Sequence, residues 1–304
     1  MFGELAKRPA AIAGAGAAAV CVWLLVTNWG PIAAGHPTYV IFYVGLLAAG
    51  VLVAGLALRN PDKRGRLWLS IIGAVVFVVF TVTAIWLKPF GATDVALEAM
   101  KGTDSVTVTQ NGGRIVMEPT GGFDAGVIFY PGARVDARAY ANILMPLAEA
   151  GNQVVIVKEP LGIAFFSTSF ADSWIADNPG PSTWIVGGHS LGGAVSSIVA
   201  NGNEAIDGLL LYASFPASDI SGRAGLEVAS IYGTNDGLAT PEQVEASVSD
   251  LPPTAVLVPI AGAIHSDFGD YGLQPGDGTA DITRPDAQAQ IAEASLTLIE
   301  LVAE

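Results

Sequence analysis

Histidine, cysteine and charged side chains are all scarce in this chain of 304 residues. It has three histidines and one cysteine, and only 14% of its residues are charged. The single cysteine, Cys21, lies in a long apolar run. Because there is no second cysteine, the chain can contain no internal disulfide. The sequence contains no metal-ligand cluster and no dinucleotide-binding fingerprint, and we expect neither a metal nor a cofactor.

Charge is missing altogether from three long runs near the amino terminus, in a chain that is 51% hydrophobic. The runs cover residues 9–28, 38–58 and 67–87, and each has about the ~20 residues that a helix needs to cross a bilayer. Aromatic side chains that favour the membrane interface fall near their ends, at Trp29, Tyr39, Trp68 and Trp86. We therefore predict a membrane anchor of three transmembrane helices within residues 1–90.

Lysine and arginine predict the orientation of this anchor. Lys7 and Arg8 precede the first run and residues 59–66 form a basic loop, whereas residues 30–37 carry no lysine or arginine. Basic loops stay in the cytoplasm. We predict a multi-pass protein of the cell membrane, with a cytoplasmic amino terminus and residues 91–304 outside. A cleavable signal peptide is the alternative interpretation of the first run, and it leaves residues 91–304 outside as well.

Positive charge is scarce in the rest of the chain. Residues 88–304 contain 8 lysines and arginines against 26 acidic residues, which gives a net charge near −18. Such a surface repels nucleic acids and anionic lipid headgroups. This composition argues against a nucleic-acid partner.

Short apolar strands alternate with helical patterns beyond residue 90. The predicted strands cover residues 114–118, 126–130, 153–158, 184–187, 208–212, 227–232 and 255–259, and the predicted helices cover 136–150, 168–176, 191–200, 241–249 and 286–302. Residues 92–113 show no clear pattern. Apolar strands separated by helices predict an α/β fold, with a mostly parallel sheet covered on both faces.

A Gly-x-Ser-x-Gly pentapeptide stands between one predicted strand and the helix after it. Its central residue is Ser190, flanked by Gly188 and Gly192. In a nucleophile elbow the serine occupies a sharp strand-to-helix turn, which leaves little room for side chains two positions away. The pattern predicts Ser190 as a nucleophile.

A serine nucleophile needs a base, and the chain offers few histidines. His36 lies between the first two apolar runs and His189 lies inside the elbow itself. His265 follows the last predicted strand, in the position where this order of residues places a base. We predict His265 as the general base, with an ordinary surface histidine as the alternative.

An aspartate must orient that base, and Asp236 is the best candidate. It follows the strand at 227–232, so its carboxylate emerges at the same sheet edge as Ser190. An ordinary turn-forming role is the alternative, and Asp219, Asp267 and Asp270 compete for the catalytic one. Asp267 and Asp270 lie too close to His265 in sequence to reach its far nitrogen readily.

Two main-chain N–H groups should stabilise the oxyanion. The first is that of Leu191, next to the nucleophile at the start of a helix. The second should come from the loop after the strand at 126–130. Pro131 has no N–H, so Gly132 and Ala133 compete, and we favour Ala133.

These segments resemble the α/β-hydrolase fold, and more narrowly bacterial dienelactone-hydrolase-like proteins of α/β-hydrolase family 5. The resemblance runs from about residue 126 to the end and rests on residues 130–136, 157–161, 187–194, 231–237 and 265–269. It implies a triad of Ser190, Asp236 and His265, with an oxyanion hole at Ala133 and Leu191. The sequence departs from the pattern at Pro131, where many members have histidine, and in using serine instead of the cysteine of dienelactone hydrolases.

Together these features predict a membrane-anchored serine hydrolase of the carboxylesterase type, acting on a small acyl ester. A peptidase or an acyltransferase uses the same residues. Outside the enzymes, a membrane-tethered binding or sensor module on the same fold is the alternative.

Overall fold

The computed structural model describes residues 9–59 and 67–304, and the chain divides into two compact units, Met1–Pro89 and Phe90–Glu304. Lys7, Arg8 and residues 60–66, on which the predicted orientation depends, lie outside the described residues. The orientation therefore stays a prediction, as does the assignment of the units to membrane and exterior.

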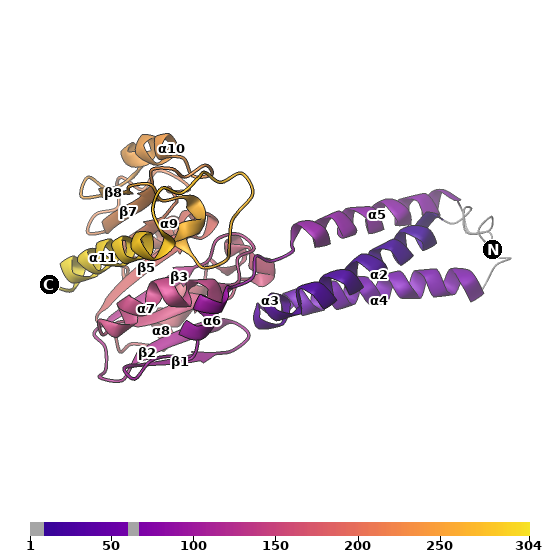
Figure 1. Cartoon of the computed structure of the whole chain (residues 1–304), viewed down its shortest axis with the longest axis horizontal. Coiled ribbons are helices and arrows are strands. Elements are labelled where there is room, and N and C mark those ends of the chain that lie inside the picture. The colour runs from indigo at the N-terminus through magenta and orange to yellow at the C-terminus, as the bar shows by residue number, and fades with distance from the viewer. Residues whose placement is uncertain (1–8, 60–66) are drawn as a thin grey trace. The chain divides into compact units, whose positions relative to one another are not determined.

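The first unit is helical. Helices α2 (Pro9–Thr27), α4 (Thr38–Arg59) and α5 (Leu67–Trp86) are long and apolar enough to cross a membrane, and a short α3 (Trp29–Ala34) follows α2 (Figure 1). Helix α2 packs against both α4 and α5. Where α2 meets α4, a Cβ on Gly50 would strike the carbonyl oxygen of Gly14. Small residues at this crossing let the two backbones approach closely, as in membrane helix pairs.

The second unit is built on one eight-stranded sheet in the order β1-β2-β4-β3-β5-β6-β7-β8. Its strands are β1 (Val106–Gln110), β2 (Arg114–Pro119), β3 (Ala125–Tyr130), β4 (Gln153–Val157), β5 (Thr183–His189), β6 (Gly208–Tyr212), β7 (Glu227–Gly233) and β8 (Val256–Ile260). Strand β2 pairs antiparallel with β1 and β4, and all other neighbours are parallel. The predicted mostly parallel sheet is confirmed.

Helices cover both faces of this sheet, which confirms the predicted architecture (Figure 1). On one face α7 (Ala141–Glu149) and α11 (Arg284–Ala303) share a core with inward-pointing strand residues such as Phe129 and Ile156. On the other face α8 (Phe170–Asp177) and α9 (Leu191–Gly202) pack with Ile128 and Val186. The central strands are buried on both sides, which explains their uninterrupted apolar sequences.

Two elements occupy the segment in which the sequence showed no clear pattern. Helix α6 (Asp94–Ala99) has six residues, and β1 is an edge strand that pairs with β2. The predicted helix at 136–150 is divided into a 3₁₀ turn, η1 (Ala137–Tyr140), and α7. Further 3₁₀ turns are η2 (Pro160–Gly162), η3 (Ala164–Ser167) and η4 (Ser247–Asp250). A short helix, α10 (Pro241–Ala246), and the 3₁₀ turn η5 (His265–Phe268) complete the segments around the site.

Strands β3, β5, β7 and β8 run parallel, so the loops after them open at one edge of the sheet. These loops contain residues 131–134, Ser190, residues 234–240 and residues 261–265. Ligand sites of open α/β sheets lie at this edge.

Candidate active site

Ser190 occupies a strained turn between β5 and α9. Its φ and ψ are 53° and −122°, a conformation that is costly for any residue with a Cβ. The neighbouring glycines make the turn possible. A Cβ on Gly188 would strike the main chain of Gly192, and one on Gly192 would strike the carbonyl oxygens of Tyr130 and Pro131. Ser214, in the segment after β6, stabilises the turn: its hydroxyl donates a hydrogen bond to the Ser190 carbonyl oxygen at 2.7 Å.

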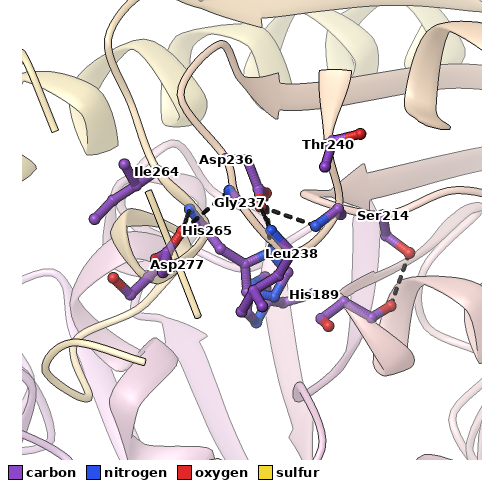
Figure 2. A network of polar contacts seen from close by, with 12 residues as sticks. His189, Ser214, Asp236, Gly237, Leu238, Thr240, Ile264, His265 and Asp277 are labelled. Atoms are coloured by element: carbon purple, nitrogen blue, oxygen red, sulfur yellow. Dashed lines mark hydrogen bonds and ion pairs between the residues drawn. The ribbon is translucent and has the colours of Figure 1, made fainter. Parts of the chain in front are cut away.

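A buried hydrogen bond joins His265 to Asp236. The Nδ1 atom of His265 lies 2.9 Å from Oδ2 of Asp236, and both residues are almost inaccessible to solvent, at 2% and 4% exposed (Figure 2). The other carboxylate oxygen, Oδ1, accepts the main-chain N–H groups of Leu238 and Ala239 at 2.7 and 2.9 Å. The carboxylate is therefore fixed from one side and offers its second oxygen to the imidazole.

One cavity of about 340 Å³ is lined by both Ser190 and His265. The other lining residues are mostly small or apolar: Leu191, Ala194, Ala213, Ser214, Phe215, Leu238, Ala239 and Gln274. The cavity brings the predicted nucleophile and base to one space of a size typical of small ligands.

The competing aspartates have other partners. Asp219 is exposed and accepts from the N–H and hydroxyl of Ser221. Asp267 accepts the N–H of Ile264 at 3.0 Å and pairs with Arg284, and Asp270 accepts from the side-chain amide of Asn142 at 3.1 Å. Of the four aspartates considered from the sequence, Asp236 alone is hydrogen-bonded to His265.

Tyr140 distinguishes the two possible donors in the loop after β3. Its hydroxyl oxygen accepts the N–H of Gly132 at 2.8 Å and lies 2.9 Å from Nδ1 of His189. The Gly132 N–H is thus already engaged. The N–H of Ala133 makes no hydrogen bond to any residue that the structure describes, although Ala133 does not line the cavity. Leu191 does line it, and as the first residue of α9 it has an N–H without a partner inside the helix.

His189 contacts the predicted base directly. It is fully buried, and its ring centroid lies 4.5 Å from that of His265. Burial, together with the neighbouring His265, holds the pKa of His189 well below its ordinary value. His189 is therefore neutral at physiological pH, with its Nδ1 side occupied by Tyr140. Nothing in the sequence indicates this packing, because Tyr140 lies 49 positions away.

Among the residues that the structure describes, no group of three or more His, Cys, Asp and Glu side chains is placed to hold a metal ion. The polar groups at the cavity are a hydroxyl, an imidazole hydrogen-bonded to a carboxylate, and main-chain N–H groups. They are suited to acid–base and nucleophilic chemistry.

A parallel sheet with a serine on a strained strand-to-helix turn defines the class of α/β hydrolases. Comparison of sequences agrees: the model of the alpha/beta hydrolase family matches residues 126–289. The chain belongs to this family. No curated protein matches it significantly.

Several solved structures are similar to this chain at low identity. TT1662 from Thermus thermophilus is similar with a TM-score of 0.51 and 14% identity, over 66% of this chain and 98% of that one. A dienelactone hydrolase-like promiscuous phosphotriesterase, P91, from metagenomic libraries has 15% identity and a TM-score of 0.46, over 62% and 92%. A putative dienelactone hydrolase from Klebsiella pneumoniae subsp. pneumoniae MGH 78578 has 14% identity and a TM-score of 0.47, over 62% and 92%.

Proposed function

We propose that this α/β hydrolase is a membrane-anchored serine hydrolase of the carboxylesterase type, with Ser190, His265 and Asp236 as its triad. The observation that carries the proposal is the buried hydrogen bond between His265 and Asp236, beside a cavity that His265 shares with Ser190. The three apolar helices of the first unit support the anchor.

In the first half of the reaction, the Ser190 hydroxyl attacks the carbonyl carbon of an ester. Nε2 of His265 takes the hydroxyl proton, while the proton on Nδ1 stays in the hydrogen bond to Asp236. The tetrahedral intermediate then collapses. His265 gives its proton to the departing alkoxide, which leaves as an alcohol, and the acyl group remains on Ser190.

In the second half, water replaces the alcohol. The water oxygen attacks the acyl carbon while His265 takes a proton from the water. His265 then gives that proton to the Ser190 oxygen as the carboxylic acid leaves. The neutral state of His189 suits this cycle, because a second positive charge beside His265 would oppose formation of the imidazolium.

The N–H groups of Leu191 and Ala133 are the proposed oxyanion donors. The Leu191 N–H lies at the positive end of α9, where developing negative charge is favoured. For Ala133 the support is indirect: Tyr140 engages the N–H of Gly132, and the close approach of Gly192 to Tyr130 and Pro131 brings this loop against the elbow. Loss of one such donor typically costs ~3 kcal/mol of transition-state stabilisation.

The proposed substrate is a neutral ester with a small acyl group. Small or apolar side chains dominate the cavity lining, and none of its residues is a lysine or arginine that would pair with a carboxylate. The excess of acidic residues in the second unit also disfavours anionic esters.

Labelling with a fluorophosphonate probe tests the nucleophile. In membranes containing the full chain, we expect the probe to label wild type but not Ser190→Ala, which lacks the proposed nucleophile. Ser173→Ala is the control and should be labelled, because Ser173 is an exposed serine on α8 whose hydroxyl donates to the carbonyl oxygen of Ser169. Strong labelling of Ser190→Ala would reject the assignment. Unlabelled wild-type protein would favour the binding or sensor module.

The same membranes test the acid and the reaction type. Hydrolysis of short-chain p-nitrophenyl esters should fall by about 10³-fold or more in Asp236→Asn and much less in Asp267→Asn. The reverse order would move the acid to Asp267. Faster turnover of peptides, or acyl transfer to added alcohols in preference to water, would replace the esterase by a peptidase or an acyltransferase.

A further inference from the structure

We propose that Asp277 is a positioning residue that fixes His265 and Asp236 relative to each other. This inference rests on the proposed triad. Asp277 lies in the loop between η5 and α11, outside any helix or strand. It does not line the cavity, so it acts through the main chain of the residues it binds.

The carboxylate of Asp277 binds the first two residues of η5. Its Oδ1 accepts the N–H of His265 at 3.0 Å, and its Oδ2 accepts the N–H of Ser266 at 2.8 Å. Figure 2 shows Asp277 beside the main chain of His265. The two bonds fix the start of the turn that carries the imidazole.

The same carboxylate also reaches the loop of the acid. Its Oδ1 lies 3.4 Å from the N–H of Gly237, the residue that follows Asp236, and 2.8 Å from the N–H of Gly278. The loops pack tightly here, since a Cβ on Gly237 would meet the main chain of Gly278 at 2.8 Å. The Asp277 side chain therefore binds the main chain at His265 and at Gly237, beside Asp236. These two residues lie 12 and 40 positions before Asp277 in the sequence.

Asp277 is ionised in this arrangement. Burial opposes its charge, but the donors of Ser266, Gly278 and His265 outweigh burial and hold the pKa of the carboxyl below its ordinary value. Hydrogen bonds from N–H groups to a carboxylate are stronger than those to a neutral acceptor. An asparagine cannot replace it, because in either orientation its NH₂ group would face main-chain N–H groups.

The variant Asp277→Asn in the full-length protein tests the proposal. We expect kcat for a short-chain ester to fall by about 10- to 100-fold, because displacements of about 1 Å at a reacting group have effects of this size. KM should stay within about twofold, since Asp277 does not touch the cavity. Asp277→Glu keeps the charge and should retain more activity than Asp277→Asn. Asp219→Asn is the matched control, an aspartate with main-chain bonds in a loop away from the cavity.

Hydrogen exchange supplies a readout that does not depend on turnover. Amides of residues 264–268 should exchange faster in Asp277→Asn than in wild type or Asp219→Asn, whereas those of α9 should not change. The proposal would be overturned if Asp277→Asn kept the wild-type kcat. It would also be overturned if the fall in kcat came with an equal rise in KM and with faster exchange throughout the second unit. If Asp277→Asn does not fold, the same criteria apply to Asp277→Ala, which removes the carboxylate without bringing an NH₂ group against the main-chain N–H groups. Wild-type protein without Ser190-dependent turnover would contradict the proposed function, and hydrogen exchange would still decide the role of Asp277.

Discussion

Glu159 is an acidic residue buried without a hydrogen-bond partner for its carboxyl group in the described part of the chain. It follows β4 and is 4% exposed. Burial raises the pKa of Glu159 well above its ordinary value. Burial therefore favours the protonated form of the side chain, which a buried site tolerates better than a charge.

Replacing Glu159 by glutamine should stabilise the protein at alkaline pH. Because the folded-state pKa is raised, wild-type stability is fully present below the ordinary pKa of a glutamate and is lost as pH rises toward the folded-state pKa. The neutral Glu159→Gln side chain avoids that loss, so we expect its Tm relative to wild type to rise between pH 5 and pH 8. Thermal unfolding from pH 5 to pH 8 measures it. A gain that grows toward pH 5 would contradict this account.

Single residues also show how far the sequence predicts a site. Scarcity of histidine, together with the position of His265 after the last predicted strand, is enough to propose it as the base, and the motif is enough to propose Ser190 as the nucleophile. The sequence favours Ala133 over Gly132, and the hydrogen bond from the Gly132 N–H to Tyr140 supports that choice with a contact that no sequence pattern indicates. Asp277 stands between two glycines, an ordinary turn sequence, so its contacts with the base and acid loops could not be predicted.

At the scale of elements, the elbow depends on how closely β3 approaches the first turn of α9. Gly192→Ala adds a Cβ that strikes the carbonyl oxygens of Tyr130 and Pro131, which are main-chain atoms and cannot turn away. We expect a loss of stability of about 1 to 3 kcal/mol and a fall in esterase activity of more than about tenfold. Thermal unfolding and ester turnover measure the two effects.

Gly202→Ala is the control for this prediction. Gly202 ends the same helix, and a Cβ there would meet nothing within 4 Å. Its substitution should change stability by no more than about 1 kcal/mol and leave activity unchanged. Equal effects at the two glycines would show that helix propensity, rather than contact with the β3 loop, controls the elbow.

The order of strands and helices was largely predictable because buried parallel strands are apolar throughout and the helices between them are amphipathic. The exceptions are informative. Strand β1 is a five-residue edge strand with threonines at alternate positions, and α6 is under two turns long. A strand with threonine at alternate positions and a helix of six residues show too little apolar patterning to be distinguished from loops.

At the scale of the whole molecule, the predicted topology can be tested through the cysteine content. The chain has one cysteine, Cys21 in α2, so a Cys21→Ser background carries no other reactive thiol. In that background Glu204→Cys, at an exposed position of the second unit, should react with a membrane-impermeant maleimide on intact bacterial host cells. Glu4→Cys, predicted to be cytoplasmic, should react only after the cells are opened.

The opposite labelling pattern would place the second unit in the cytoplasm. Reaction at both positions in intact cells would agree with neither orientation and would indicate leaky cells. A third variant, Ser173→Cys, provides a second exposed position on the same unit and should behave like Glu204→Cys.

The groups at the site come from segments that lie far apart along the chain. Ala133, Ser190, Asp236, His265 and Asp277 follow or flank four different strands, and they meet only when the continuous run of strands β3-β5-β6-β7-β8 has paired. Contacts of such large sequence separation form late and slowly in folding. Catalysis should therefore appear only with the last step of refolding, after most secondary structure has returned, and turnover would report complete assembly of the sheet more faithfully than circular dichroism.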